Sequence, residues 1–491
     1  MSLQSVYEVA STRPSSTAVV HDDTPVSYAG FAAAIATTCR CLQGRELPQD
    51  RTVVVMIRNL LHCWTTVLAL QALGLNTVSV RSPAVLAALG LGKVATLVTT
   101  ETDAESHEPD LDPSMGYEII QIPAPTFDTE DATIARPFAL GATPGGHILY
   151  TSGTTGNYKK IFWSGELQRR RNSERIGSMA DFNASTVFHC ADFGLWTAAG
   201  YKNPLATWHA GGCVILDQRP DWYAHFLQSG LTHTTLVPDK LHQLVAFIRE
   251  QQPPPGMGDF RLFVTSGFLS HGLAEQIMNL VTRKLENAYG STEASIMVLR
   301  SQVHELDDLH WLNPVPQRVV EIVDEQGRAC PAGVEGEVRL RLLELDCHAY
   351  MDDPAASSRF FRDGCFYPGD MAMRRADGRV RILGRSTDVI NLRGQKLSVA
   401  PVEQAIQARL GVAAVCLFSS ITAGGDNELA IAIESARWPE KSVLDDLRHQ
   451  FAEFEQVQFA LLPQFPRTQT GTSKIDRITL RKLIYTDSAT A

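Results

Sequence analysis

The stretch HILYTSGTTGNYKKIFWSG, from His147 to Gly165, joins a short apolar run to a loop of hydroxyls and glycines. The apolar residues Ile148 to Tyr150 predict a buried strand, and Thr151 to Gly156 predict the loop that follows it. Glycine permits turns that aim several backbone N–H groups at one anion, and Lys159 would add a compact positive charge. A polar surface loop is the alternative, because the phosphate-loop pattern GxxxxGK[ST] does not occur in the chain.

Composition indicates a globular protein that binds a small molecule. The 491 residues are 44% hydrophobic and 20% charged, which is enough for more than one core. The formal net charge of −10 argues against nucleic acid as a partner. Nine cysteines without a CxxC pair predict reduced, structural thiols. No export signal or membrane anchor is predicted, so a cytoplasmic location is expected.

The order of apolar segments predicts an α/β protein with a smaller unit at its C-terminal end. Strands and helices alternate through the first three hundred residues or so, as in RTVVVMIRN followed by CWTTVLALQALGLNTVSV, and this alternation predicts largely parallel sheets. From about Val319 the pattern becomes β-rich, and MAMRRADGRVRILGR predicts a hairpin that turns at Ala376 to Gly378. The last hundred or so residues predict a compact α+β unit.

A second polar stretch, LENAYGSTEAS from Leu285 to Ser295, carries groups suited to a nucleotide. Tyr289 offers a ring that can stack on a base, and Thr292 offers a hydroxyl for a phosphate. Glu293 offers a carboxylate for Mg²⁺, a hard cation that takes oxygen ligands and shares them with phosphates. The alternative for this stretch is the capped start of a helix.

Taken together, these stretches resemble the motifs of the adenylate-forming superfamily, which contains acyl-CoA synthetases, the adenylation domains of peptide synthetases and luciferases. The resemblance continues, in the family's order, through VTSGFLS, GEVRLR (336–341), FYPGD (366–370), GRSTDVINLRGQKLSVAPVE (384–403) and RTQTGTSKIDR (467–477). It covers the chain from about Ile148 to Arg477. It implies a large N-terminal domain of several subdomains, residues 1–385, and a small mobile α+β domain, residues 386–491.

The resemblance also implies the roles of individual residues at an ATP site. The first loop would hold the β- and γ-phosphates. Tyr289 would pack on the adenine ring, and Asn287 and Ala288 would lie along its edge. Asp370 and Arg385 would hold the ribose. Thr292 and Glu293 would serve the α-phosphate and the metal. The implied ATP-binding residues are Thr151, Ser152, Gly153, Thr154, Thr155, Gly156, Lys159, Asn287, Ala288, Tyr289, Gly290, Asp370 and Arg385.

Two further positions match the family's C-terminal machinery. Lys474, in SKIDR, matches the catalytic lysine that reaches between the carboxylate and the α-phosphate, although the family usually reads glycine then lysine and this chain has Thr472 and Ser473 between Gly471 and Lys474. Thr387 occupies the place of the hinge residue, usually aspartate or lysine.

Other departures and one match bear on the chemistry. Tyr158 and Lys160 stand where the family usually has proline and glycine, while Asn391 matches acyl-CoA synthetases of the VIN…G type. Between the two polar stretches, Phe193, Trp196 and Tyr201 are expected to line the acyl pocket, although aromatic residues more often fill a core. A weaker alternative is that the substrate is an amino acid whose amino group pairs with Asp192.

The resemblance therefore implies an acid:CoA ligase that uses ATP, Mg²⁺ and CoA to convert a carboxylic acid to an acyl-adenylate and then a thioester. A first alternative is a stand-alone adenylation enzyme that loads the acyl group onto a separate carrier protein. A second is a degenerate member that binds nucleotide without turnover, which the departures at Tyr158, Lys160 and Thr472–Ser473 keep open.

Overall fold

The quoted stretch folds into an antiparallel hairpin at the edge of a parallel sheet. The computed structural model describes residues 2–45, 47, 52–91, 94–100, 118–127, 143–152, 158–179, 182–191, 193–251, 256–392, 395–421, 427–468 and 474–487. Gly153 to Gly156, Asp192 and Gly471 to Ser473 therefore lie outside the described residues. Thr151 and Ser152, which the sequence assigned to the loop, extend strand β7 (His147–Ser152), because they pair with Lys159 and Tyr158 of β8 (Tyr158–Trp163).

This hairpin completes a six-stranded sheet with the order β6-β5-β3-β4-β7-β8, in which only β8 runs antiparallel to its neighbour. Its strands are short and fully buried at their centres, as expected of a parallel sheet covered by helices. The remaining elements of this part are β3 (Thr52–Val55), β4 (Asn76–Ser79), β5 (Val94–Thr100), β6 (Glu118–Ile122), α2 (Tyr28–Gln43), α3 (Leu60–Ala72) and α4 (Pro83–Leu89).

A second, nine-stranded sheet has the order β15-β14-β13-β12-β11-β9-β10-β1-β2. The six central strands, in the spatial order β13-β12-β11-β9-β10-β1, pair in parallel. Strand β2 is added antiparallel at one edge, and β14 and β15 are added antiparallel at the other. Its elements are α1 (Ser2–Thr12), β1 (Thr17–His21), β2 (Thr24–Ser27), α6 (Gln168–Ser178), β9 (Val187–His189), α7 (Ala198–His209), β10 (Cys213–Leu216), α8 (Trp222–Phe226), β11 (His233–Leu236), α9 (Pro238–Glu250), β12 (Arg261–Val264), α10 (His271–Leu280), β13 (Lys284–Tyr289), β14 (Leu299–Gln302) and β15 (Asn313–Pro314).

The β-rich region is a third sheet, and its hairpin turns where the sequence predicted. Strands β20 (Asp370–Arg374) and β21 (Val380–Arg385) pair across the turn at Ala376 to Gly378. The other elements are η3 (Leu306–Leu309), β16 (Val320–Val323), β17 (Glu335–Arg341), α11 (Pro354–Phe360), β18 (Phe361–Arg362) and β19 (Cys365–Phe366).

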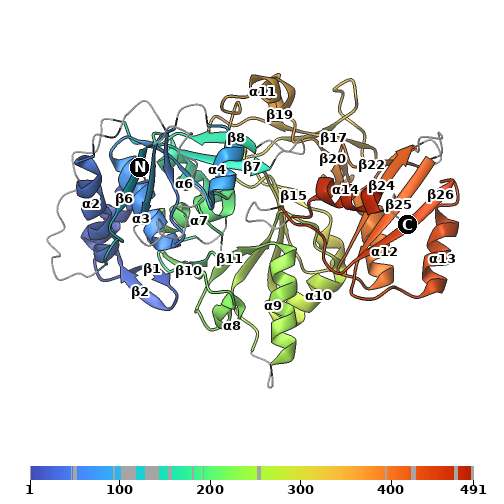
Figure 1. Ribbon diagram of the computed structural model, residues 1–491, viewed down its shortest axis with the longest axis horizontal. Helices are drawn as coiled ribbons and strands as arrows, with labels where there is room; N and C mark the ends of the chain where they lie inside the picture. The colour runs from blue at the N-terminus through green and yellow to red at the C-terminus, as the bar shows by residue number, and fades with distance from the viewer. Residues whose placement is uncertain are drawn as a thin grey trace.

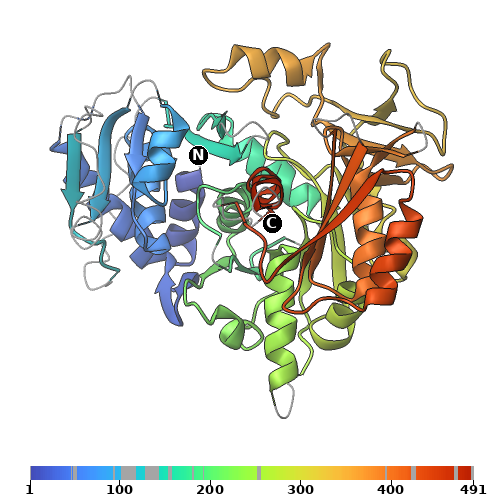
Figure 2. The ribbon, with the colours of Figure 1, turned by 45° about the vertical axis from the view of Figure 1, so that its right-hand side comes forward.

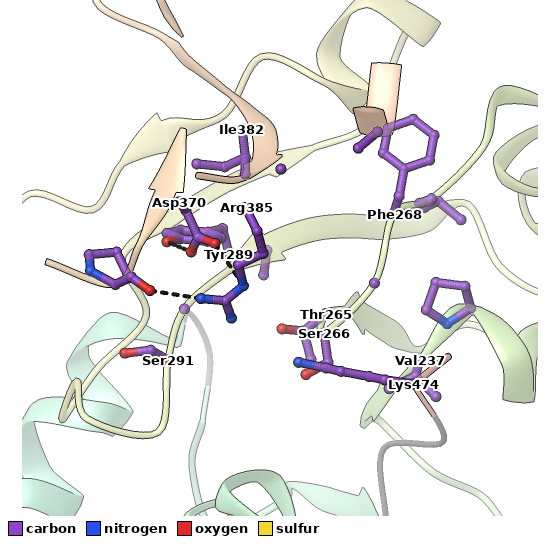
Figure 3. A pocket seen from close by; sticks show the side chains of 18 of the residues that line it. Val237, Thr265, Ser266, Phe268, Tyr289, Ser291, Asp370, Ile382, Arg385 and Lys474 are labelled. Atoms are coloured by element: carbon purple, nitrogen blue, oxygen red, sulfur yellow. Dashed lines mark hydrogen bonds and ion pairs between the residues drawn. The ribbon is translucent and has the colours of Figure 1, made fainter. Parts of the chain in front are cut away.

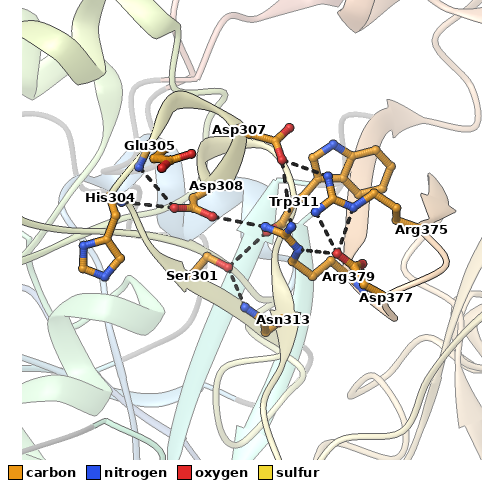
Figure 4. Close-up of polar contacts among 10 residues, drawn as sticks. All are labelled: Ser301, His304, Glu305, Asp307, Asp308, Trp311, Asn313, Arg375, Asp377 and Arg379. Atoms are coloured by element: carbon orange, nitrogen blue, oxygen red, sulfur yellow. Dashed lines mark hydrogen bonds and ion pairs between the residues drawn. The ribbon is translucent and has the colours of Figure 1, made fainter.

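Polar contacts fix this hairpin against the edge of the nine-stranded sheet (Figure 4). Arg375 donates to Asp307 at 2.8 Å, Arg379 donates to Asp308 at 3.1 Å, and both arginines donate to Asp377. Each pair is partly exposed and contributes little by itself, but the contacts form a network. The network lies at the turn of the hairpin, whereas Asp370 pairs with Arg385 at its open end.

The C-terminal region has its own sheet and its own cores. Strands β24 (Ala414–Ile421), β25 (Asn427–Glu434) and β26 (Gln456–Leu462) pack against α12 (Val399–Leu410), α13 (Lys441–Gln450) and α14 (Arg477–Asp487). The short hairpin of β22 (Val389–Leu392) and β23 (Gln395–Ser398) precedes them and was not predicted. Figure 1 shows this region at the end of the molecule opposite α2, and Figure 2 shows it against the segment that carries α9 and α10.

Two general properties complete the description. Each of the nine cysteines is free, and six of them are buried. Within the described residues, no helix is both long enough and apolar enough to cross a membrane.

Candidate active site

A cavity of about 760 Å³ lies between the six-stranded sheet, the nine-stranded sheet, the β-rich sheet and the C-terminal region. The loops after β11, β12 and β13 form one wall, as expected for a ligand site at the carboxyl ends of parallel strands. The hairpin β7–β8, the hairpin β20–β21 and the C-terminal region supply the others. The predicted site residues that line this cavity are Thr151, Lys159, Trp196, Asn287, Ala288, Tyr289, Gly290, Thr292, Glu293, Asp370, Arg385, Thr387 and Lys474.

Tyr289, Asp370 and Arg385 form one hydrogen-bonded group in this cavity (Figure 3). The Tyr289 hydroxyl donates to Asp370 Oδ2 at 2.5 Å, and Arg385 Nε lies 3.1 Å from Asp370 Oδ1. Asp370 is 7% exposed, and its burial raises its carboxyl pKa, an effect that Arg385 and Tyr289 oppose. The arrangement holds a carboxylate rigidly at the cavity wall, where it can accept hydrogen bonds from a diol.

Glu293 also lines the cavity and keeps one oxygen available. Its side chain is buried, and the Tyr350 hydroxyl donates to Oε1 at 2.6 Å. For Oε2 the described residues provide no hydrogen-bond donor. The described part of the chain also contains no group of three His, Cys, Asp or Glu side chains that could hold a metal ion. The donor set therefore fits a cation that takes one protein carboxylate and completes its shell with phosphate and water oxygens, as Mg²⁺ does.

The two lysines of the quoted stretch point in different directions. Lys159 Nζ lies 3.4 Å from the centre of the Phe360 ring inside the cavity, and burial lowers its pKa while Glu293 opposes that shift. Lys160 instead donates to the Gly90 carbonyl at 3.1 Å and is 7% exposed. The departure from glycine at position 160 thus serves a structural contact away from the cavity.

Lys474 enters the cavity from the C-terminal region. It lines the cavity with Asp370 and Arg385 (Figure 3), and its side chain is accessible to solvent. Desolvation in the cleft lowers its pKa, as does the positive charge of Arg385, while Asp370 and Glu293 raise it. The cavity therefore brings a cation of the C-terminal region to the carboxylates of the N-terminal region.

Comparison with known proteins assigns the family. The family model for AMP-binding enzyme matches residues 6–342, more than half of the chain. The chain belongs to the AMP-binding enzyme family. A solved structure, the amide bond synthetase McbA from Marinactinospora thermotolerans, has the same fold with a TM-score of 0.78 and 20% identity over 98% of this chain and 100% of that one.

The curated relatives of this AMP-binding enzyme have different activities in their names. The phosphinothricin tripeptide synthetase PhsB of Streptomyces viridochromogenes is 27% identical over 74% of this chain and 31% of its own length. The 2-hydroxy-7-methoxy-5-methyl-1-naphthoate–CoA ligase of Streptomyces carzinostaticus is 27% identical over 72% of this chain and 65% of its own length. The match thus spans less than two thirds of either relative, and one name is that of a peptide synthetase and the other that of a CoA ligase.

Lys202 is one of the cavity residues of the AMP-binding enzyme that the sequence analysis did not predict. Lys202, on α7, donates to the backbone carbonyls of Thr292 and Ala294, both at 2.8 Å, and so holds the segment that carries Glu293. Burial lowers its pKa well below the usual value. The sequence signal for Lys202 is a lysine among mostly apolar neighbours in AAGYKNPLATW. The sequence does not indicate which backbone carbonyls this lysine contacts.

Of the three aromatic residues predicted for the acyl pocket, only Trp196 lines the cavity. Tyr201 is 2% exposed in the core, where its ring stacks on His147 and Trp64 at centroid distances of 4.3 and 5.6 Å. Phe193 is buried in a separate core cluster. Both therefore belong to the packing of the domain, and the acyl-pocket prediction is kept for Trp196. The amino-group alternative at Asp192 lies outside the described residues.

Proposed function

We propose that this AMP-binding enzyme is an ATP- and Mg²⁺-dependent acid:CoA ligase. The observation that supports it best is that Lys159, Glu293, Asp370, Arg385 and Lys474 line one cavity although they come from distant parts of the chain. A protein that only binds nucleotide has no need for a lysine opposite the buried carboxylates. The degenerate alternative is therefore the less favoured one.

The proposed first half-reaction forms the acyl-adenylate. A carboxylate oxygen of the acid attacks the α-phosphorus of ATP, the bond to the leaving oxygen breaks, and pyrophosphate departs. Negative charge develops on the α-phosphate and on the leaving group, so cations positioned in advance lower the barrier. Lys474 would stabilise the α-phosphate and the attacking carboxylate, Lys159 the β- and γ-phosphates, and Asp370 would hold the ribose hydroxyls. Glu293 would hold Mg²⁺, which neutralises phosphate charge when bound.

The proposed second half-reaction transfers the acyl group to the thiol of CoA and releases AMP. The thiol must approach the acyl carbon after pyrophosphate leaves, so the C-terminal domain, residues 386–491, would rotate relative to residues 1–385. Thr387, the proposed hinge, lines the cavity two residues after the end of β21. The cores of the C-terminal region begin at Ile390, which supports a boundary at this point.

Pyrophosphate exchange tests the proposal. The enzyme is mixed with ATP, Mg²⁺, labelled pyrophosphate and each acid of a panel, and acid-dependent label in ATP is expected. Free CoA or a phosphopantetheinylated carrier protein is then added. Consumption of the adenylate by free CoA supports the ligase, and consumption by the carrier alone favours the first alternative, which the match to a peptide synthetase also favours. No exchange with any acid would contradict adenylate formation.

The substitution Glu293→Gln is expected to raise the Mg²⁺ concentration that gives half-maximal exchange by roughly tenfold, because the amide loses the charge that binds a hard cation. The fold should be retained, since the amide oxygen can still accept the Tyr350 hydroxyl. Exchange is measured against Mg²⁺ concentration, with Glu335→Gln, an exposed acid on β17, as the control. Superimposable Mg²⁺ curves for Glu293→Gln and the parent would remove Glu293 as a metal ligand.

A further inference from the structure

Arg175 is a cation in the cavity wall that the reaction described above does not use. It lies on α6, lines the cavity, and is mostly screened from solvent. Its Nε and Nη2 both donate to Asn203 Oδ1, at 2.8 and 2.5 Å. Burial lowers its pKa to about 10, and in the described part of the chain no carboxylate lies close enough to oppose that shift.

The other arginines of the cavity lining differ from Arg175 in a consistent way. Arg385, Arg467 and Arg477 are paired with Asp370, Glu434 and Glu403, respectively. Arg359 has no such pair but is exposed. Among these arginines, Arg175 alone is half-buried and has no carboxylate partner in the described part of the chain, which is costly unless a ligand supplies the missing anion.

The contacts of Arg175 leave the correct donors for a carboxylate. Asn203 takes the side of the guanidinium formed by Nε and Nη2, so the end formed by Nη1 and the second Nη2 hydrogen stays available. This end presents two parallel N–H groups that match the two oxygens of a carboxylate. Asn203 is itself fixed, because its Nδ2 donates to the Thr235 hydroxyl at 3.3 Å, and both of these side chains are buried cavity residues.

The surroundings of Arg175 are polar. Lys202, on the neighbouring helix α7, also lines the cavity. Its ammonium group donates to uncharged carbonyls rather than to a carboxylate. Arg175, Lys202, Asn203 and Thr235 thus form a polar wall, whereas a pocket for a plain alkyl or aryl acid is lined mainly by apolar side chains.

We propose that this polar wall binds a second carboxylate of the acid substrate, so that the enzyme activates dicarboxylic acids and Arg175 determines this specificity. The inference rests on the proposed function, since one carboxylate is activated in the same cavity. In the bound acid, the reacting carboxylate would lie between Lys474 and the α-phosphate, and the second would receive the end-on N–H pair of Arg175.

Paired acids test the inference. Pyrophosphate exchange is measured with dicarboxylic acids of three to eight carbons, with benzene dicarboxylic acids, and with the monocarboxylic acid of the same skeleton for each. For the best pair, the parent enzyme is expected to favour the diacid by roughly tenfold or more in kcat/KM. Arg175→Gln should reduce exchange with the diacid by a similar factor and leave the KM for ATP unchanged. The ratio of kcat/KM for the diacid to kcat/KM for the matched monoacid should then be near one.

Two further variants keep the test decisive. Asn203→Asp would supply an internal carboxylate to Arg175 and should also abolish the preference for the diacid, even if Arg175→Gln does not fold. Arg170→Gln removes an exposed arginine from the same helix and should leave the ratio unchanged. A parent enzyme that prefers monoacids, or an Arg175→Gln variant that raises the KM for ATP and affects both acids alike, would overturn the inference while adenylate formation stands. Absence of exchange with every acid would instead remove the proposed function, and the inference with it.

Discussion

Replacing Lys474 by alanine is expected to slow adenylate formation by about a hundred- to a thousandfold, the scale of losing one positioned transition-state donor. Transfer from a preformed acyl-adenylate to the thiol should stay close to the parent rate, because the proposed rotation of residues 386–491 would move Lys474 away from the phosphate before the thiol attacks. The two steps are measured separately, by pyrophosphate exchange and by thioester formation from synthetic acyl-adenylate.

The control for this variant is Lys441→Ala, which removes an exposed lysine from the start of α13 in the same region. The surroundings of Lys474 also predict a pH effect. Because its pKa is lowered, the protonated form is lost at a lower pH than for an ordinary lysine, so the alkaline decline of adenylation should begin early and be absent from Lys474→Ala. Equal damage to both steps would assign the role of Lys474 to another residue.

Replacing Asp370 by asparagine is expected to lower kcat/KM for ATP by about a hundredfold, because two charge-assisted hydrogen bonds to the ribose are weakened at once. The same change leaves Arg385 without its carboxylate, while the shape of the side chain is retained. The expected loss lies mainly in the KM for ATP, with a smaller loss in kcat, and it is measured from ATP-dependent exchange at saturating acid.

The matched control is Asp377→Asn, at the turn of the same hairpin, where the carboxylate is exposed and pairs with Arg375 and Arg379. Burial raises the pKa of Asp370, so protonation on acidification should weaken ATP binding at a higher pH than for an exposed aspartate. Deoxy-ATP provides the second readout. The fall in kcat/KM caused by Asp370→Asn is measured with ATP, with 2′-deoxy-ATP and with 3′-deoxy-ATP. If the fall is equally large with all three nucleotides, then Asp370 does not hold the ribose.

Much of the fold followed from local patterns. The strand at Ile148 to Tyr150, the helix α9 and the hairpin β20–β21 each carry an apolar pattern or a turn signal within a few residues. The extent of β7 did not follow, because Thr151 and Ser152 have loop-forming composition and become strand only through pairing with β8. The composition of a short stretch does not indicate which strand it pairs with.

The residues proposed to contact the ligand could be predicted from the sequence, whereas the residues that hold other parts of the protein in place could not. Asp370, Glu293 and Lys474 could be proposed from motif position alone. The role of Lys202 could not, because its partners are backbone carbonyls about ninety positions downstream along the chain. Tyr201 and Lys202 are adjacent on α7, yet one ring packs in the core and the other side chain reaches the cavity, a difference set by helix register.

The most direct test of the central claim follows the oxygen atoms of the acid. The enzyme is incubated with ATP, Mg²⁺, CoA and a substrate acid whose carboxylate carries ¹⁸O, and the products are analysed by mass spectrometry. Attack of the carboxylate on the α-phosphorus leaves its oxygen on the phosphate when the acyl group departs. The account predicts AMP that carries one ¹⁸O atom, together with unlabelled pyrophosphate. ¹⁸O in inorganic phosphate, or its absence from AMP while thioester forms, would contradict it.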